Sequence, residues 1–466
     1  MFFISHFLLA QLPYTVKQYN ISVEKDILYG TVTGFAGEQV ELVLDLYKPI
    51  GDGNCQRPLL VMAHGGGFIA GSRHDNDVVK ICEEMAARGY VTASIEYRLG
   101  MHPLNYYEPY ALCNDAINPV GISKCIYMAD TLEFLRGMYR AQQDMKGAVR
   151  FLKGRHDLDS TDVGNVFVGG SSAGAITALA TGFLDLPSEK PAAALAQPDA
   201  PTSDADLASC VPAPGDRTRP DLGPIEGELN GNGHDASIQG VADFMGAVYT
   251  PLLLTNATDT PAVYAYHRTD DLVVLSNSGP LFMLYPYCLN PINLCQPLYT
   301  RPFFDGSSSI LTALESMGSG APPLFNDILD YGPADGDDCL DNPPGHSIDN
   351  IPLRCENLSG FFAQIIEANG NTLTGNCASA TQLREAEPKL TVFPNPVTGN
   401  EINIICEECP KTATLRLFDK IGYEVANTKA DIGHCKWRIG TLPVGSYFLQ
   451  VTTPEWTTTK FICIKL

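Results

Sequence analysis

The sequence predicts an α/β protein with a mostly parallel sheet covered by helices on both faces, followed by a small β-sandwich. Over residues 40–368, short apolar runs alternate with helical segments, which is typical of strands buried on both faces. A serine flanked by glycines lies between one such strand and the next helix. From residue 389 the chain changes to short alternating segments separated by Gly, Pro and Asn, a pattern typical of β-sandwiches.

The composition indicates a large folded protein with more than one domain. The chain has 466 residues, 45% of them hydrophobic, which is enough for a sizeable core. Its formal net charge is -22. The excess of acid lies in residues 1–388, because residues 389–466 hold nine Lys and Arg against seven Asp and Glu. No basic patch is evident, so we expect no nucleic-acid partner and attribute the acidic surface to solubility.

Cysteine usage and the N-terminal residues indicate export. The 14 cysteines show no His/Cys spacing convincing for zinc, so we expect disulfides formed in an oxidising compartment and no bound metal. Residues 1–11 are apolar and short, and we interpret them as the hydrophobic end of a signal peptide; a buried strand is the alternative. No later apolar run reaches the roughly 18 residues that a membrane-spanning helix needs.

The larger domain, residues 12–369, alternates strands and helices. Predicted strands cover residues 38–49, 58–63, 90–95, 166–169, 240–245, 262–266 and 324–329. Predicted helices cover residues 77–88, 139–152, 175–180 and 356–368. Residues 101–138 and 184–237 interrupt this alternation and are interpreted as insertions, the second of them mobile or lid-like. Residues 370–388 are polar and weakly periodic, and we interpret them as a linker to residues 389–466.

The run Gly170–Gly174 has the pattern of a nucleophile elbow. Its sequence, GSSAG, fits G-x-S-x-G and lies between the strand that begins at Val166 and a helix of small residues. A serine hydroxyl is a weak nucleophile unless it is held exposed beside a base, and a sharp strand-to-helix turn exposes it. Ser172 is therefore the candidate nucleophile, and Ser171 occupies the variable position. The alternative is an ordinary tight turn before a helix.

A second glycine-rich run, His64–Gly67, directly follows an apolar strand upstream of the elbow. Glycines leave backbone N–H groups free to point at a developing negative charge, which side chains would obstruct. We therefore assign the amides of Gly66, Gly67 and Ala173 to a candidate oxyanion hole, and we expect His64 to hold the loop. The alternative is a flexible turn.

The acid that would orient a catalytic base follows from chain order. In proteins with this elbow the order is Ser, then Asp or Glu, then His. Asp270 and Asp271 come directly after a predicted strand, where an orienting carboxylate would lie. Spacing from His267 favours Asp271, and Asp270 is the alternative.

The candidate base is His346. Only two histidines follow Asp271, and the second, His434, belongs to the small domain. His346 stands in a Gly-His-Ser run on a loop after the last predicted strand, from which an imidazole can reach across to Ser172.

The loop around His346 is bracketed by Cys339 and Cys355, and we expect a disulfide between them to restrict it. The pairs Cys113–Cys125 and Cys288–Cys295 are similar local candidates. The aspartates of residues 335–341 are interpreted as a solvated acidic loop, with a calcium site as the alternative.

Residues from about 40 to 368 resemble α/β-hydrolase carboxylesterases of the HGGG type, including feruloyl-esterase-like and hormone-sensitive-lipase-like groups. The matching pieces are Leu44–Pro49, His64–Phe68, Ser94–Arg98, Gln143-Asp144, Gly170–Gly174, His267–Val274 and Gly345–Ser347. The resemblance implies an α/β-hydrolase fold and ester hydrolysis through a Ser172-His346-Asp271 triad and an acyl-enzyme, with no cofactor. Arg268 departs from the family, which usually has glycine there, and this departure leaves the shape of the substrate pocket open.

Residues 389–466 resemble the C-terminal sorting domain of bacterial type IX secretion. The matching pieces are Val392–Pro396, Leu442–Leu449 and Lys460–Leu466. The resemblance implies that this domain binds the type IX secretion machinery and that the protein is secreted or attached at the cell surface.

The preferred hypothesis is a secreted serine carboxylesterase acting on a small or polymeric ester. Narrower alternatives are a polyester esterase and a feruloyl- or acetyl-polysaccharide esterase. Alternatives from other classes are a surface-displayed binding protein that has lost catalysis and a peptidase on the same fold. The sequence leaves the ester and the oligomeric state open.

Overall fold

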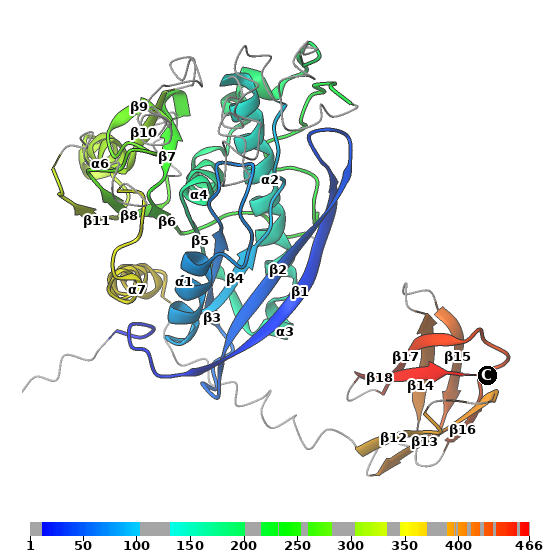
Figure 1. The fold of residues 1–466 in the computed structure, drawn as a ribbon. Coiled ribbons are helices and arrows are strands. Elements are labelled where there is room, and N and C mark those ends of the chain that lie inside the picture. The colour runs from blue at the N-terminus through cyan, green and yellow to red at the C-terminus, as the bar shows by residue number, and fades with distance from the viewer. Residues whose placement is uncertain are drawn as a thin grey trace, which may run out of the picture. The chain divides into compact units, whose positions relative to one another are not determined.

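A computed structural model describes most of the chain, which divides into two compact units, Met1–Asn376 and Cys377–Leu466 (Figure 1). The described residues are 12–102, 131–200, 216–231, 233–252, 260–281, 303–332, 345–370, 389–395, 397, 399–407, 412–419, 424–431, 435–453 and 457–465.

The larger unit is built on an eight-stranded sheet with the order β1-β2-β4-β3-β5-β6-β8-β11. Its strands are β1 (Asn20–Thr33), β2 (Gln39–Ile50), β3 (Arg57–Ala63), β4 (Val91–Ile95), β5 (Thr161–Ser171), β6 (Gly240–Phe244), β8 (Ala262–Arg268) and β11 (Leu324–Leu329). The pairs β1–β2 and β2–β4 are antiparallel, and every other pair is parallel. The predicted mostly parallel sheet is confirmed.

Alternate side chains of the central strands enter two separate cores, because successive residues of a strand point to opposite faces. In β3, Leu60 and Met62 pack with helices α1 (Asn76–Ala86) and α7 (Ile351–Ala368). Leu59 and Val61 pack with helices α2 (Thr131–Gly154) and α4 (Ala173–Phe183) on the other face. Figure 1 shows the two pairs of helices on opposite sides of the sheet, as expected for strands that are apolar throughout.

Helix α2 begins at Thr131, eight residues before the predicted start, so the irregular segment expected over residues 101–138 is shorter than predicted. The early turns bury Phe134, whose ring lies 5.3 Å from Phe68 and 6.0 Å from Phe304, centroid to centroid. These partners are distant in sequence, so the local pattern did not indicate the helix. Residues 103–130 lie outside the described part of the chain.

The second predicted insertion, residues 184–237, is largely irregular where it is described, and it is bound along α2. Short 3-10 turns cover Pro187–Glu189 and Ala192–Ala194. Arg136 donates hydrogen bonds to the carbonyl oxygens of Ala193 and Pro220, at 2.9 and 2.7 Å. Farther along the helix, Lys153 Nζ lies 2.7 Å from a carboxylate oxygen of Asp235.

Four elements near the ends of β6 and β8 were not predicted. Strands β7 (Ala247–Tyr249), β10 (Phe303–Gly306) and β9 (Ser278–Pro280) form a small sheet in that order, and helix α6 (Ser307–Glu315) continues from β10. The strands have only three or four residues each, too few for a periodic pattern. Strand β1 was also missed, because its charged and apolar residues do not alternate as on a half-buried face.

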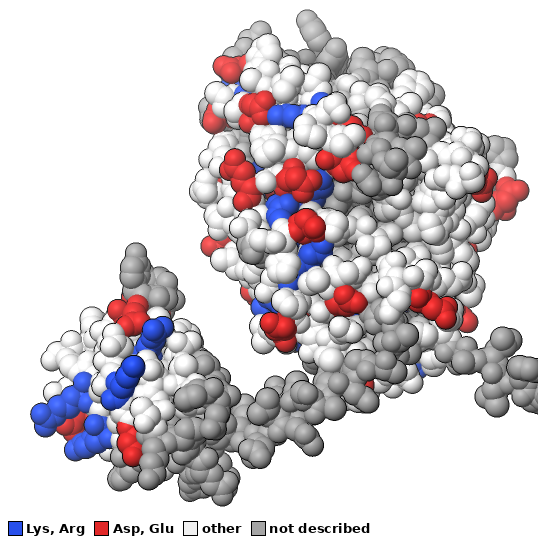
Figure 2. Space-filling model, turned by 180° about the vertical axis from the view of Figure 1, so that it is seen from behind, with Lys and Arg blue, Asp and Glu red and all other residues white. Residues whose placement is uncertain are grey.

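The C-terminal unit consists of two antiparallel sheets, β12-β13-β16 and β15-β14-β17-β18. Their strands are β12 (Lys389–Phe393), β13 (Glu401–Glu407), β14 (Ala413–Asp419), β15 (Glu424–Ala430), β16 (Cys435–Arg438), β17 (Gly445–Thr452) and β18 (Thr457–Ile464). Ile402 of one sheet shares a buried core with Leu415 and Leu449 of the other, so the predicted β-sandwich is confirmed. On the face drawn in Figure 2, Lys and Arg gather on this unit, whereas Asp and Glu are spread over the larger one.

No helix among the described residues is both long enough and apolar enough to cross a membrane.

Candidate active site

Ser172 occupies the sharp turn between β5 and α4. Its backbone has φ 56° and ψ -119°, a left-handed conformation that a residue with a side chain rarely adopts. The turn is possible because its flanking residues are glycines. A Cβ on Gly170 would stand 2.2 Å from the carbonyl carbon of Gly174, and one on Gly174 would stand 2.1 Å from the oxygen of Ala63. The GSSAG run therefore forms the tight elbow that its pattern predicts.

The structure brings Ser172, His346 and Asp271 into one hydrogen-bonded line. His346 Nε2 lies 2.8 Å from Ser172 Oγ, and His346 Nδ1 lies 2.7 Å from Asp271 Oδ2. The three residues come from the end of β5, the loop after β8 and the loop before α7, separated by as many as 174 positions. A nucleophile, a base and an orienting acid would need contacts in this order.

Asp271, rather than Asp270, faces His346. Asp271 is 1% exposed, and its Oδ1 accepts hydrogen bonds from the amides of Val273 and Val274 at 2.8 and 3.0 Å. Burial alone would raise the pKa of Asp271, but the charges and hydrogen bonds of His346 and His267 hold that pKa well below its ordinary value. The Asp270 carboxylate instead pairs with Arg268, at 2.6 and 2.9 Å.

The loop that carries His346 packs against the loop that carries Asp271. Gly345 has φ 66°, and a Cβ there would stand 2.3 Å from the carbonyl oxygen of Asp270. On the other side of His346, the hydroxyl of Tyr266 donates to the carbonyl oxygen of Ser347 at 3.1 Å and accepts from the amide of Asp349 at 2.7 Å. Backbone packing and one buried tyrosine thus set the position of the imidazole.

The predicted oxyanion loop packs directly on the elbow. A Cβ on Gly65 would stand 3.3 Å from both the Ser171 carbonyl oxygen and Ser172 Cβ. The Ser172 amide donates to Phe244 O at 2.9 Å, so this amide is not available to an oxyanion at the elbow. Gly66 and Gly67 have φ 104° and 64°, conformations that suit glycine.

His64 lies under this loop rather than in the triad. Its Nδ1 is 2.8 Å from the carbonyl oxygen of Gly65, and its Nε2 is 3.4 Å from a carboxylate oxygen of Glu96. The ring also stacks on Tyr97, with centroids 4.5 Å apart. These contacts agree with the expectation that His64 holds the loop.

The expected disulfide around His346 is not supported. Cys355 is a free thiol in helix α7, fully buried in the core that it shares with the free thiol of Cys82. Helix α7 starts at Ile351 and buries Cys355 against α1, which turns this cysteine toward the core. Cys339, the aspartates of residues 335–341 and the pairs Cys113–Cys125 and Cys288–Cys295 lie outside the described residues. No group of three His, Cys, Asp or Glu able to hold a metal occurs among the residues that are described.

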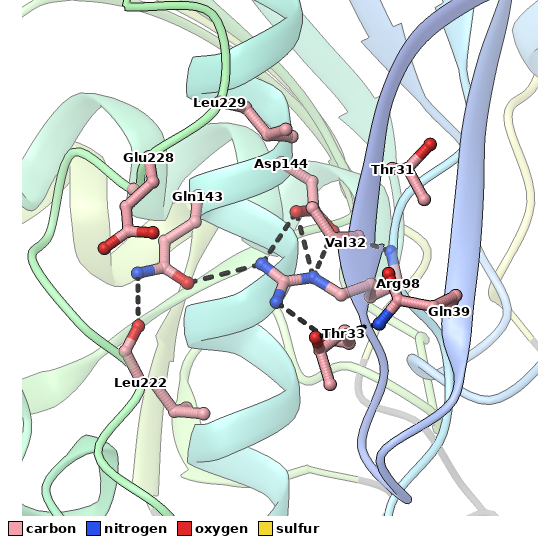
Figure 3. Close-up of a pocket in the computed structure, with 11 residues that line it drawn as sticks. Thr31, Val32, Thr33, Gln39, Arg98, Gln143, Asp144, Leu222, Glu228 and Leu229 are labelled. Carbon is pink, nitrogen blue, oxygen red and sulfur yellow. Dashed lines mark hydrogen bonds and ion pairs between the residues drawn. The ribbon is translucent and has the colours of Figure 1, made fainter.

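A polar pocket of about 440 Å³ lies elsewhere, between β1, α2 and the loop of residues 222–229 (Figure 3). Arg98 and Asp144 meet in it, with Nε 2.9 Å from Oδ2, and Figure 3 shows this pair between helix and hairpin. Strands β1 and β2 form the far edge of the sheet, several strands from β5, whose end carries Ser172. The Arg98–Asp144 pair ties the segment after β4 to α2.

Three further side chains continue the hydrogen bonds beyond Asp271, and none of them was predicted from the sequence as a site residue. They are His267, Ser307 and Asp243, which form a buried hydrogen-bonded chain that ends on Asp271. His267 had a sequence signal, because it stands four residues before the acid. Ser307 and Asp243 had none, because they lie 36 and 28 positions away on elements that only folding brings together.

Comparison with known proteins identifies two parts of the chain. Residues 44–111 match the BD-FAE family model, which describes an esterase-like domain. Residues 391–465 match the secretion system C-terminal sorting domain. None of the curated proteins compared with the chain matches it.

Among solved structures, the chain is similar to a truncated carbohydrate esterase from gut microbiota, with 12% identity and a TM-score of 0.40 over 76% of this chain and 99% of that one. It is also similar to a thermophilic esterase from Thermogutta terrifontis, with 12% identity and a TM-score of 0.35 over 80% and 94% of the two chains. A third similar structure is a bifunctional GH43-CE protein of Bacteroides eggerthii, with 12% identity and a TM-score of 0.38 over 74% and 35%.

The sorting-domain match indicates a protein that is secreted or attached at the cell surface through a type IX secretion machinery. The chain thus joins a larger unit with a mostly parallel sheet, in which residues 44–111 match the BD-FAE model, to a C-terminal unit that matches the secretion system sorting domain.

Proposed function

We propose that the larger unit is a serine carboxylesterase in which Ser172 is the nucleophile, His346 the base and Asp271 the orienting acid. The observation that supports this proposal is the continuous line of hydrogen bonds from Ser172 Oγ through His346 to Asp271, with links of 2.8 and 2.7 Å. Such a line requires long-range folding, and an ordinary tight turn or a solvated loop histidine would not produce it.

The line of hydrogen bonds defines where the protons move. Asp271 is ionised and accepts from His346 Nδ1, so Nε2 of the neutral imidazole is free to accept the Ser172 proton as Oγ attacks the ester carbonyl. The resulting imidazolium returns this proton to the leaving alcohol, and an acyl group remains on Ser172. Water then attacks the acyl-enzyme with His346 as base again, which releases the acid and restores Ser172.

The oxyanion that forms at each attack would be stabilised by the amides of Gly66, Gly67 and Ala173. Backbone amides held by a rigid elbow and loop need no reorganisation when the charge appears, which is why such donors lower the barrier. One lost donor typically costs about 10²- to 10³-fold in turnover. The HGGG loop favours esters over amides, and we therefore propose carboxylic esters as the substrate class.

Labelling with a fluorophosphonate probe tests the nucleophile directly. We expect the full chain to be labelled at Ser172 and to hydrolyse p-nitrophenyl esters, and we expect Ser172→Ala to lose both properties. Ser171→Ala is the matched control, because Ser171 is also buried in the elbow but makes no contact with His346 among the described interactions. A labelled Ser172→Ala protein, or an inactive Ser171→Ala protein, would reject the assignment.

A substrate panel separates the narrower possibilities. Kinetic constants on p-nitrophenyl esters of increasing acyl length, on methyl ferulate and on an acetylated polysaccharide would distinguish a general carboxylesterase from a feruloyl or acetyl esterase. A properly folded protein that neither reacts with the probe nor hydrolyses any of these esters would favour a non-catalytic binding protein.

A further inference from the structure

Behind the acid of the triad, three buried side chains continue the hydrogen-bonded line away from Ser172. His267 Nε2 lies 3.1 Å from Asp271 Oδ2, and His267 Nδ1 lies 2.7 Å from Ser307 Oγ. Ser307 Oγ in turn lies 2.7 Å from Asp243 Oδ2. His267, Ser307 and Asp243 are all fully buried, so no solvent supplies or removes protons freely here.

The contacts of His267 fix where its first proton lies. Nε2 has two neighbours, Asp271 Oδ2 and the carbonyl oxygen of Val274 at 2.8 Å, and both can only accept. Nε2 must therefore carry a hydrogen and donate it toward them. In consequence Asp271 Oδ2 accepts from two imidazoles at once, His346 on one side and His267 on the other.

The Ser307 hydroxyl has one hydrogen for two short contacts. If Ser307 donates to Asp243, then Nδ1 of His267 must donate to Ser307, and His267 is an imidazolium between two carboxylates. If Ser307 donates to His267, then Asp243 must donate to Ser307, and Asp243 is a neutral acid. Both arrangements hold one proton more than a neutral His267 with an ionised Asp243, and both give His267, Asp271 and Asp243 a total charge of -1.

We propose that His267, Ser307 and Asp243 are positioning residues that retain this one proton and thereby hold Asp271 Oδ2 in line with His346. This inference rests on the proposed esterase function and adds residues that act on the acid rather than on the substrate. A carboxylate with Oδ1 on two amides and Oδ2 between two imidazoles has little freedom to rotate. Without His267, one of these four fixed donors would be lost.

The surroundings favour retention of the proton. Burial lowers the pKa of His267, but the hydrogen bond and charge of Asp271 and the charge of Asp243 more than offset this, so the pKa is raised. Burial raises the pKa of Asp243, against smaller opposing effects of His267, Ser307 and the Gly246 amide. Asp271 and Asp243 are thus the charged groups acting on His267, while His346 faces Asp271 from the opposite side.

The chain also connects the acid to the small sheet. Ser307 is the first residue of α6 and directly follows β10, whose Gly306 amide donates to Asn277 O at 3.1 Å. Asp243 Oδ1 accepts from the amide of Gly246 at 2.7 Å, immediately before β7. Ser307 and Asp243 are therefore both tied to residues that adjoin the sheet β7-β10-β9, on the side of His267 away from Asp271.

Replacement of Ser307 tests the positioning role. In Ser307→Ala, His267 Nδ1 and Asp243 Oδ2 lose their shared partner, and we expect kcat on a p-nitrophenyl ester to fall by about 10- to 100-fold with little change in KM. Ser308→Ala is the control, because Ser308 follows in the same helix turn but is partly exposed and lies outside this line of hydrogen bonds. If folded Ser307→Ala keeps the kcat of Ser308→Ala, the proposal is wrong.

The Asp243→Asn substitution tests whether His267, Ser307 and Asp243 together retain the extra proton. The amide oxygen can still accept from Gly246 and the NH₂ group can donate to Ser307, as a neutral acid would, so we expect the pH profile of kcat/KM to stay where it is in the unmodified protein. If Asp243 were ionised beside a neutral His267, the substitution would remove a negative charge behind Asp271. The acidic limb of the profile would then move to lower pH, which would overturn the proposal.

A measurement independent of turnover covers the case in which Ser307→Ala does not fold. In the full chain labelled with ¹⁵N-histidine, the signals lost in His267→Gln identify His267, and we expect them to stay constant from about pH 5 to about pH 9. Titration of His267 within that range would reject the retained proton. If the unmodified protein is not labelled by a fluorophosphonate, the esterase proposal fails instead, whatever the variants show.

Discussion

Gly345 lies directly against Asp270, so that a Cβ on Gly345 would stand 2.3 Å from the Asp270 carbonyl oxygen. This contact joins the loop of the base to the loop of the acid through backbone alone. Gly345 precedes His346 and Asp270 precedes Asp271, so this backbone contact fixes the spacing between His346 and Asp271.

Gly345→Ala should separate these two loops. The substitution adds a backbone clash to a left-handed conformation at φ 66°, so we expect kcat to fall by about 10- to 100-fold as His346 shifts by a fraction of an ångström. Gly370→Ala is the control, since Gly370 has φ 75° but a Cβ there would meet no atom within 4 Å. Equal turnover of the two variants on a p-nitrophenyl ester would show that the contact does not position the base.

Asp271→Asn should be far more harmful than Asp270→Asn. An amide at 271 offers a donor where His346 Nδ1–H needs an acceptor, which favours the wrong tautomer and costs about 10⁴-fold in turnover in triads of this kind. Asp270 instead pairs with Arg268, so its replacement should change kcat little. Steady-state kinetics of both variants decide, and an equal loss in the two would remove the distinction between them.

The pKa of Asp271 also predicts how stability depends on pH. Because the pKa in the folded protein is lowered, ionised Asp271 stabilises the fold at every pH above its unfolded pKa of about 3.9. This contribution is lost as the pH falls through the still lower folded pKa. Urea unfolding of the unmodified protein and of Asp271→Asn should therefore differ above about pH 4 and converge in stronger acid. A difference that grows as the pH falls below about 4 would contradict the assigned direction.

The ion pair between Arg98 and Asp144 should matter for stability and not for chemistry. Asp144 is fully buried, so Asp144→Ala would leave the Arg98 guanidinium without its buried partner and should lower the free energy of unfolding by about 3–5 kcal/mol. Lys17→Ala is the contrasting variant, because its bond to Glu84 lies at the surface and such pairs contribute below about 1 kcal/mol. Denaturant unfolding measures both, and similar losses would show that burial of the pair is unimportant.

The C-terminal unit should be dispensable for ester hydrolysis. A chain that ends at Asn376 keeps Ser172, Asp271 and His346 with all their described contacts, so its kcat and KM on small esters should equal those of the full chain. In the native host the shortened protein should fail to reach the cell exterior, because residues 391–465 form the sorting domain. Secretion of the shortened form in normal amounts would contradict the sorting role.

Short-range patterns in the sequence predicted the turn at Ser172 and the glycine-rich run His64–Gly67. The chain order Ser, acid, His limited which residues could complete the site. The GSSAG run predicted the turn at Ser172 because glycines at 170 and 174 are a local steric requirement. The apolar strands predicted a parallel sheet, and in such a sheet the residues that follow the strands gather at one edge. Spacing from His267 favoured Asp271 over Asp270, and elimination left His346. The structure places His346 beside Ser172 and Asp271 beside His346.

Tertiary structure alone decided the features that depend on packing between distant segments. It turned Cys355 into the core between α1 and α7 as a free thiol, because the helix begins earlier than its sequence pattern indicated. It also aligned Ser307 and Asp243, 64 positions apart, behind His267. Hydrogen bonds of this kind leave no periodic signal, since they depend on how elements stack rather than on the residues next to them in sequence.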